Sequence, residues 1–249
     1  METKYSGRIC EPELSEEDRI RYGRMISIDR IGEEGMRKLR EGKVMVVGCG
    51  ALGSVAAMYL AGAGVGKIGI ADFDTIDISN LQRQLFFEEK IVGSPKADAL
   101  ANRIRSLNNS VVLEIYRHLI NEEKARTIFR EYDFIIDATD NPSSKFMTDK
   151  ICRELEKPYC IGGVREGEGQ IMSWHAGSIP YSEVFSAPEC TGGFTPCSIG
   201  GVLGPAAGVV ASIQASEAIK HLSGAGEMLY DKIFTIDLFS MRSLLLRLD

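Results

Sequence analysis

Residues 43–53 have the sequence KVMVVGCGALG, and this stretch decides the fold of the chain. Residues 43–47 are an apolar, β-branched run that predicts a buried strand, and it leads directly into three glycines with G-x-G-x-x-G spacing. A helical pattern follows from Ser54 to Ala63. Strand, glycine turn and helix in this order are typical of a βαβ unit that binds a nucleotide.

The three glycines, Gly48, Gly50 and Gly53, each have a physical role in such a turn. They permit the tight turn, let backbone N–H groups approach a phosphate, and bring the helix close to the strand. The N-terminus of the helix then faces an anion. The sequence therefore predicts that the backbone of this turn contacts the phosphates of a nucleotide.

An acidic strand end follows at the expected distance. A second apolar run, residues 67–71, ends in Asp72-Phe73-Asp74, and Asp72 lies 24 positions after Gly48. An acidic residue about this far along such a unit usually binds a ribose hydroxyl. Asp72 is therefore the predicted ribose ligand, whereas Asp74 and Asp77 also fit as ordinary polar residues after a strand.

The same alternation of strands and helices continues to about residue 165. Helices are predicted between Ser15 and Arg40, with a break at Gly32 and Gly35, and then at 94–107, 121–130 and up to Glu156. Strands are predicted at 111–116, 133–138 and 158–161. This rhythm predicts a Rossmann-like α/β fold with a doubly wound, mainly parallel sheet.

The pattern changes after residue 165. Residues 170–175 alternate between polar and apolar side chains, as expected for an antiparallel strand with one exposed face. We expect a long loop without elements of its own at 176–201, an apolar helix at 201–222 and a β-hairpin at 230–247. Residues 1–249 are interpreted as one domain with N-terminal helices at 15–40, a nucleotide-binding core at 43–165 and an antiparallel extension at 166–249.

Composition excludes several classes of protein. The 249 residues carry a net charge of −6 without a basic stripe, so a nucleic-acid-binding surface is not expected. No apolar run is long enough to span a membrane and residues 1–18 do not resemble a signal peptide, so a soluble, cytoplasmic protein is expected. The six cysteines form no C-x-x-C pair, which indicates neither a zinc cluster nor a disulfide framework.

Polar and cationic residues after the second strand suggest a triphosphate. Arg83 offers a planar fork for phosphate oxygens and Lys96 a compact positive charge, so both can neutralise charge that accumulates at an α-phosphate. Asp140 follows the strand at 133–138 and is expected to face the same crevice, where its carboxylate suits Mg²⁺. A dehydrogenase would not require these additions, so the set predicts adenylyl transfer.

Over nearly its whole length the chain resembles the ubiquitin-activating-enzyme-like adenylyltransferases, the ThiF/MoeB/HesA group. The segments that carry the resemblance are Arg21-Tyr22-Gly23-Arg24, Gly48 to Gly53, Asp72-Phe73-Asp74, Ser79 to Gln84, Gly93-Ser94-Pro95-Lys96, Thr139-Asp140-Asn141, and Cys197 with Gly201 to Pro205. Such proteins activate small ubiquitin-like sulfur carrier proteins.

The resemblance implies a homodimer in which each site binds Mg·ATP. The C-terminal Gly-Gly carboxylate of the carrier (ThiS- or MoaD-like, for thiamine or molybdopterin biosynthesis) attacks the α-phosphate and gives an acyl-adenylate. A sulfur-donor protein is a further implied partner. Asp140 would bind Mg²⁺, and Arg24 would reach the site of the partner subunit.

The implied nucleotide-binding residues are Gly48, Gly50, Ala51, Leu52, Gly53, Asp72, Asp74, Asn80, Arg83, Gln84, Lys96, Asp140 and Asn141. The implied catalytic residues are Arg24, Arg83, Lys96, Asp140 and Cys197.

Some interpretations stay open. An NAD-dependent oxidoreductase, a silent carrier-binding scaffold and a tRNA-modifying adenylating dehydratase of the same superfamily are the alternative functions. Arg165 and Gln170 fit either contact with the carrier tail or a structural role at the late sheet, and Asp137 fits support of a strand end better than metal binding. Many relatives carry two C-x-x-C pairs for a structural zinc, which this chain lacks, so no structural zinc is expected.

Cys197 occupies the position at which the resemblance implies sulfur transfer or covalent attachment to the carrier; a small apolar residue at a loop-to-helix junction is the alternative. For the variant Cys197→Ala we expect adenylation to continue and the downstream sulfur step to be impaired, because only that step needs the thiol. Thiocarboxylate formation on the carrier is the measurement. Sulfur transfer at the wild-type rate would leave Cys197 with the structural role.

Overall fold

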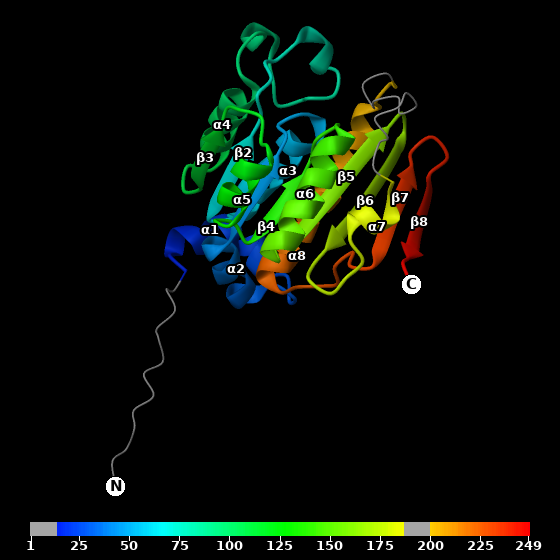
Figure 1. Cartoon of the computed structure of the whole chain (residues 1–249). Helices are drawn as coiled ribbons and strands as arrows, with labels where there is room; N and C mark the ends of the chain where they lie inside the picture. The colour runs from blue at the N-terminus through cyan, green and yellow to red at the C-terminus, as the bar shows by residue number, and fades with distance from the viewer. Residues whose placement is uncertain (1–13, 187–199) are drawn as a thin grey trace.

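The computed structural model describes residues 14–186 and 200–249. Figure 1 shows the elements along the chain. The helices are α1 (Glu16–Ile26), α2 (Gly32–Glu41), α3 (Ala51–Ala63), α4 (Lys96–Leu107), α5 (Glu122–Phe129), α6 (Pro142–Leu155), α7 (Tyr181–Val184) and α8 (Gly204–Ser223), with 3₁₀ turns η1 (Ile78–Asn80) and η2 (Glu89–Ile91). The strands are β1 (Lys43–Val47), β2 (Lys67–Ala71), β3 (Val112–Tyr116), β4 (Phe134–Asp137), β5 (Tyr159–Arg165), β6 (Glu168–Trp174), β7 (Lys232–Asp237) and β8 (Arg242–Arg247).

The strands form one eight-stranded sheet in the order β3-β2-β1-β4-β5-β6-β7-β8. β1 to β5 are parallel, whereas β6, β7 and β8 are added as successive antiparallel strands. β1 and β4 are neighbours, so the strand order reverses at β1, which is the topological switch point where open α/β sheets bind ligands. The predicted fold class, a Rossmann-like parallel sheet with an antiparallel C-terminal extension, is confirmed.

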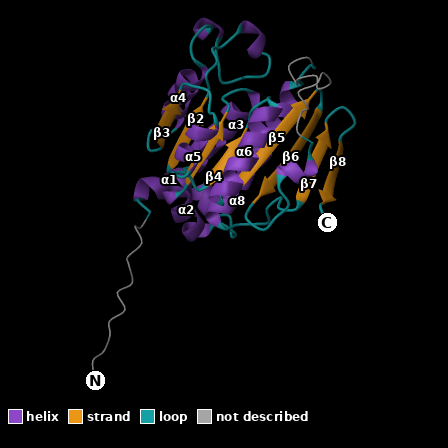
Figure 2. Cartoon of the chain, in the orientation of Figure 1, coloured by secondary structure: helices purple, strands orange, loops and turns teal. Residues whose placement is uncertain are grey.

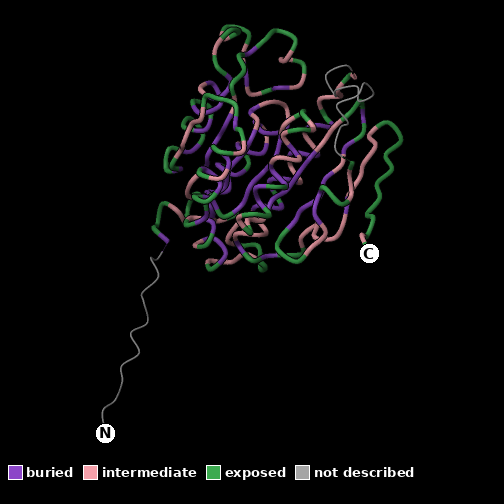
Figure 3. Tube along the Cα trace, in the orientation of Figure 1, coloured by how far each residue is buried: buried purple, intermediate pink, exposed green. Residues whose placement is uncertain are grey.

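The parallel strands are buried on both faces because helices cover both. Val44 and Val46 of β1 pack in a core with α2, α3, α4 and α8, while Met45 and Val47 face a second core with α5 and α6. In Figure 2, α5, α6 and α7 lie in front of the sheet. Figure 3 shows the buried centre of this sandwich and the exposed trace of β8, all of whose residues are exposed.

The glycine turn between β1 and α3 is packed too tightly for side chains. Gly48 has φ +94°, and a Cβ at Gly53 would lie 1.8 Å from the carbonyl oxygen of Gly48. A Cβ at Gly53 would also lie 3.3 Å from Cβ of Ala138 in the turn after β4. The absence of a side chain at residue 53 therefore lets α3 begin directly on the turn and beside β4.

The segment between β2 and α4 forms an arch at the top of Figure 1. Its two ends are joined by a bridge between Thr75 and Pro95, and the next residue, Ile76, is buried. The described cysteines, Cys49, Cys152 and Cys160, are buried free thiols. Within residues 14–186 and 200–249, no helix has the length and apolar character needed to cross a bilayer.

Three local predictions were wrong. A helix break is predicted at Gly32 and Gly35, but the break lies at residues 27–31 and Gly32 begins α2. Gly35 lies inside α2, where a Cβ at residue 35 would come within 3.3 Å of Cβ of Ser223. The loop predicted at 176–201 contains the short helix α7. The helix expected from Ser54 begins at Ala51, because the glycine turn supplies its first residues.

Two glycines of α3 give a matched test of the close approach. We expect Gly53→Ala to lower the free energy of unfolding by about 3 kcal/mol or more, because its Cβ collides with the backbone. Gly62→Ala should raise it by about 0.5–1 kcal/mol, because residue 62 is exposed and its Cβ would make only an ordinary contact with Leu107. Urea denaturation of both variants is the measurement; equal effects would contradict the close approach at Gly53.

Candidate functional site

The predicted nucleotide-binding residues meet at the carboxyl ends of the parallel strands. The glycine turn follows β1, Asp72 follows β2 and the turn with Thr139, Asp140 and Asn141 follows β4. A Cβ at Gly48 would lie 3.0 Å from the carbonyl oxygen of Ala138, so the turns after β1 and β4 are in contact. Gly50, the residue before α3, provides no side-chain cap. The first N–H groups of α3 therefore have no partner within the helix and can bind an anion.

Asp72 ties the glycine turn to the segment after β2. One carboxylate oxygen accepts a hydrogen bond from the Cys49 backbone N–H at 2.7 Å, and the other accepts one from the Asp74 N–H at 2.8 Å. Burial raises the pKa of this carboxyl above its ordinary value of 3.8, although the two N–H donors and Lys96 oppose the shift. Asp72 thus has a structural role in the turn in addition to its predicted contact with ribose.

Lys96 and Asp74 are the charged pair next to this turn. Lys96 is the first residue of α4 and is buried, and its Nζ lies 3.0 Å from a carboxylate oxygen of Asp74. The backbone N–H of Lys96 also donates to the carbonyl oxygen of Asp74 at 3.0 Å. Asp74 is exposed. A phosphate that binds here would compete with an exposed carboxylate for a cation that is already oriented.

The predicted phosphate-binding segment, residues 79–84, lies against the glycine turn and the start of α8. A Cβ at Gly50 would lie 3.7 Å from Nε2 of Gln84, and one at Gly204 would lie 3.5 Å from Cα of Arg83. Gln84 is 4% exposed, and within the described chain its side-chain oxygen has no hydrogen-bond partner. Arg83 donates to the Ser79 carbonyl oxygen at 3.1 Å, and Asn80 accepts from the Asp77 N–H at 3.2 Å.

The turn after β4 presents Asp140. Its carboxylate is exposed, lines a cavity and makes no side-chain hydrogen bond or ion pair to another described residue. Asn141 caps α6, because its side chain accepts from the Ser143 N–H at 2.9 Å. The described residues contain no cluster of three or more His, Cys, Asp or Glu that could hold a metal ion. One unengaged carboxylate beside an anion site suits Mg²⁺, which usually binds through one or two carboxylates together with phosphates.

One predicted catalytic residue, Arg24, is not at this edge of the sheet, and another, Cys197, cannot be placed because it is not among the described residues. Arg24 is exposed on α1, and its neighbour Tyr22 packs against Gly64 at the C-terminal end of α3, opposite the glycine turn. A helix of 13 residues is about 20 Å long, so Arg24 lies roughly that far from the turn of its own chain. Cys197 lies outside the described residues, as do Cys10 and Cys190.

A cavity of about 1000 Å³ begins at Asp140 and extends over the antiparallel strands. It is bounded by α6 and α7 on one side and by β5 to β8 on the other, and both Arg165 and Gln170 line it. Arg165 is one of four charged residues in a row across the strands, since Arg165 pairs with Glu168, Glu168 with Asp237 and Asp237 with Arg242. We call this space the sheet groove.

Sequence reasoning missed the buried polar network beneath the Asp140 turn. Asp137 is fully buried and forms an ion pair with Lys145 of α6, and Gln214 of α8 donates to the Asp137 carbonyl oxygen at 2.8 Å. The interpretation of Asp137 as a support of the strand end agrees with these contacts. A charged residue at the end of an otherwise apolar strand was the available signal, but nothing in the sequence identified Lys145 as its partner.

A model described as the ThiF family matches residues 22–248. The "Adenylyltransferase and sulfurtransferase MOCS3" of Culex quinquefasciatus is 36% identical over 235 residues, covering 94% of this chain and 54% of the relative. "Adenylyltransferase and sulfurtransferase MOCS3-1" of Zea mays is 38% identical over 223 residues, covering 89% of this chain and 48% of the relative. The chain thus spans about half the length of the curated relatives it matches.

Solved structures share the fold at lower identity. A structure described as SeMet PaaA has a TM-score of 0.80 and 22% identity, covering 99% of this chain and 77% of that one. The structure of Escherichia coli MccB with ATP has a TM-score of 0.75 and 21% identity, and the match covers 86% of this chain and 66% of that one. At this identity the likeness establishes the architecture alone.

The raised pKa of Asp72 gives a pH test of the glycine turn. The pKa of Asp72 in the folded chain lies above the unfolded value of 3.8, so protonation of Asp72 favours folding. This contribution to the free energy of unfolding is fully present below pH 3.8, and it is lost as the pH rises through the folded-state pKa. We expect the stability of the wild-type chain relative to Asp72→Asn to fall as the pH rises from about 3.8 and then to level off. Denaturation of both proteins between acid and neutral pH is the measurement. A relative stability that increases with pH would show that hydrogen bonding outweighs burial.

Proposed function

The chain belongs to the ThiF family, and on this premise we propose that it is an ATP-dependent adenylyltransferase acting on a protein carboxylate. Its acceptor in this proposal is the C-terminal Gly-Gly of a small ubiquitin-like sulfur carrier protein, which becomes an acyl-adenylate. One observation carries the proposal: the sheet groove begins at Asp140, in the turn that contacts the glycine turn. A nucleotide site and an acceptor groove therefore adjoin at one carboxylate.

The names of the relatives favour this reaction over the alternatives. The matched proteins of Culex quinquefasciatus and Zea mays are named adenylyltransferases and sulfurtransferases. An NAD-dependent oxidoreductase would account for the glycine turn and Asp72, but not for Lys96 or an unengaged Asp140 next to a groove. A tRNA-modifying dehydratase is less favoured because the net charge is −6.

In the proposed complex the glycine turn and the first N–H groups of α3 bind phosphate oxygens. Asp72 accepts hydrogen bonds from backbone groups, so it reaches a ribose hydroxyl only by sharing its carboxylate oxygens with them. Lys96 exchanges its exposed partner Asp74 for a phosphate, and Arg83 and Asn80 lie on the adjacent segment. Gln84 turns its amide nitrogen toward Gly50, and its side-chain oxygen has no partner among the described residues. Ala51, Leu52 and Asn141 complete the proposed set through their backbone.

The proposed chemistry needs positioning and charge more than a general base. The carrier carboxylate is already ionised, so its oxygen can form a bond to the α-phosphorus while the bond to the bridging oxygen breaks and pyrophosphate leaves. Charge that develops on the phosphoryl oxygens would be stabilised by Arg83 and Lys96. Asp140 would hold Mg²⁺, which, when bound, neutralises phosphate charge.

The sheet groove is the proposed acceptor site. A C-terminal tail can lie along the antiparallel strands with its terminal carboxylate at Asp140, and Arg165 and Gln170 then contact the tail. The glycines at the end of such a tail suit the approach, because residues without side chains let the backbone come close to neighbouring groups. Thiamine or molybdopterin biosynthesis is the proposed setting, and a sulfur-donor protein is the proposed second partner.

A homodimer would complete the site. Arg24 lies roughly one helix length from the glycine turn of its own chain, so it can act on a phosphate only in a neighbouring subunit. The proposal treats residues 1–249 as one adenylation domain. Cys197 is proposed for the sulfur step that follows adenylation.

ATP–pyrophosphate exchange tests the proposed function. With Mg²⁺ and a small β-grasp carrier that ends in Gly-Gly, we expect exchange that disappears when the carrier lacks its tail. Asp140→Ala should lower the rate by about 10²-fold or more, because Asp140 is the proposed metal ligand and acts in the transition state. Glu131→Ala is a control, since Glu131 is an exposed carboxylate before β4, at the opposite end of that strand from Asp140. Absence of exchange with several such carriers would reject carrier activation.

A further inference from the structure

A buried ammonium group lies against the backbone of the Asp140 turn. Lys145 of α6 has a side chain that is 8% exposed, and its Nζ lies 2.7 Å from the carbonyl oxygen of Thr139 and 2.7 Å from that of Gly162 on β5. A carboxylate oxygen of Asp137 lies 3.1 Å from the same atom. An ammonium group has three N–H donors, and these three acceptors use all of them.

Asp137 holds the same turn from the other side. One oxygen of its carboxylate accepts from the Thr139 N–H at 3.1 Å and from the Thr139 hydroxyl at 2.7 Å. Its other oxygen accepts from the Thr148 hydroxyl at 2.8 Å. The N–H, hydroxyl and carbonyl of Thr139 are therefore all bound to the Asp137–Lys145 pair. The next residue along the chain is Asp140, and the one after it, Asn141, is fixed as the cap of α6.

Stability alone does not explain a charge pair at this position. Removing two charges from water is expensive, and well-packed apolar residues in place of a buried pair are often as stable or more stable. An apolar pair could hold α6 on the sheet, but it could not bind the Thr139 carbonyl. What the charges add is a set of directional hydrogen bonds to the backbone next to Asp140.

We propose that Asp137 and Lys145 are positioning residues that hold the Asp140 carboxylate at the place where Mg²⁺ and the ATP phosphates meet. Lys145 also binds the carbonyl oxygen of Gly162, and the adjacent residue, Gly163, lines the sheet groove. One ammonium group therefore fixes the position of the Asp140 carboxylate relative to the sheet groove. The inference rests on the proposed function, because it assumes that Asp140 binds the metal of a nucleotide complex.

Two variants test the pair. Lys145→Met removes the ammonium group and keeps the length of the side chain. The double variant Asp137→Asn with Lys145→Met leaves no unpaired buried charge, and it decides the question if the single variant does not fold. The readout is the Mn²⁺ concentration that half-saturates the protein–ATP complex, followed by electron paramagnetic resonance without any carrier. ATP binding without metal is measured by calorimetry.

In both variants we expect the half-saturating Mn²⁺ concentration to rise by about 10-fold or more, the usual effect of losing a group that orients a metal ligand. ATP binding without metal should be unchanged, because the glycine turn and Lys96 are left intact. In the exchange reaction with carrier, the Mg²⁺ concentration for half-maximal rate should rise by a similar factor.

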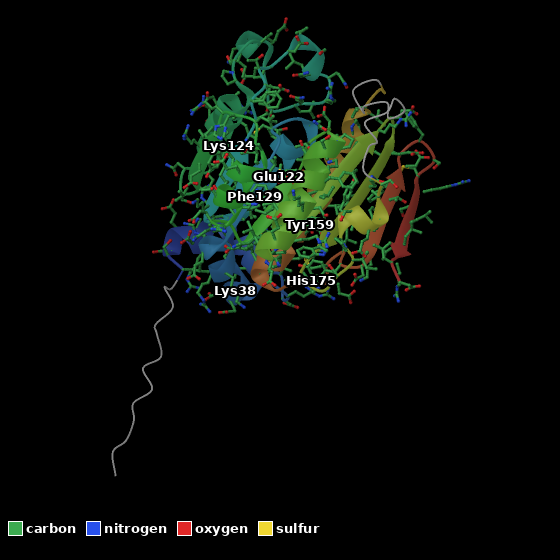
Figure 4. The ribbon with its side chains drawn as sticks, viewed as in Figure 1. Lys38, Glu122, Lys124, Phe129, Tyr159 and His175 are labelled. Atoms are coloured by element: carbon green, nitrogen blue, oxygen red, sulfur yellow. The ribbon has the colours of Figure 1, made fainter. Side chains whose placement is uncertain are left out.

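Tyr159→Phe is the matched control. Tyr159, labelled in Figure 4, is the first residue of β5, and its hydroxyl donates to Asp149 of α6 at 2.6 Å and accepts from the Tyr181 N–H at 2.9 Å. Like Lys145, it is a buried polar tie between β5 and α6, but it does not contact the Asp140 turn. We expect this variant to lower the midpoint of thermal unfolding and to leave Mn²⁺ binding unchanged.

Unchanged Mn²⁺ binding in both Lys145 variants, with only a lower unfolding midpoint, would overturn the inference and leave the pair a structural role. Because the metal readout contains no carrier, failure to find an active carrier does not affect it. If the wild-type chain with ATP binds no Mn²⁺, the proposed nucleotide function fails and the positioning role fails with it.

Discussion

The architecture depends on the approach of the first turn of α3 to the carbonyl oxygen of Gly48. No side chain fits at Gly53, where a Cβ would lie 1.8 Å from that oxygen. Because the helix begins directly on the turn, its free N–H groups point to the carboxyl end of β1. The same approach brings Ala138 within contact distance, so the turn after β4 lies beside the glycine turn. One backbone contact thus sets the distance between the N-terminus of α3 and Asp140.

The polar groups around this contact divide into those that hold the backbone and those that remain available. Asp72 holds Cys49 and Asp74 through their N–H groups, and the Asp137–Lys145 pair holds Thr139. Lys96, in contrast, is paired with an exposed carboxylate, and Asp140 is not engaged by any described residue. A polyanion can displace an exposed partner at small cost, whereas breaking a buried pair leaves an uncompensated charge. The burial of each partner therefore separates the groups that are available to a ligand in the proposed function from those that hold the backbone.

Sequence patterns predicted the parts of the fold that depend on local chemistry. The apolar runs, the G-x-G-x-x-G spacing and Asp72 identified the first βαβ unit, and the change to alternating residues after 165 identified the antiparallel strands. Gly32 and Gly35 misled the prediction, because Gly35 is needed for packing against α8, which is remote in sequence. The Asp137–Lys145 pair could not be identified for a similar reason: it depends on how α6 lies on β4 and β5, which no periodicity encodes.

The position of the sheet groove follows from the direction of the strands. Parallel neighbours need crossover connections, and the helices in these connections cover both faces of β1 to β5. After β5 the strands are antiparallel, and the links from β5 to β6 and from β7 to β8 are short turns without helices. α8 packs against β5 and β6 from one side, while among the described helices α6 and the four-residue α7 border the other. Within residues 14–186 and 200–249, this second face of the antiparallel strands therefore forms the groove, which starts at the last parallel strands, where Asp140 lies. In the proposed reaction an acceptor would reach the Asp140 turn along this groove, because the first antiparallel strand, β6, lies only two strands from β4 at the switch point.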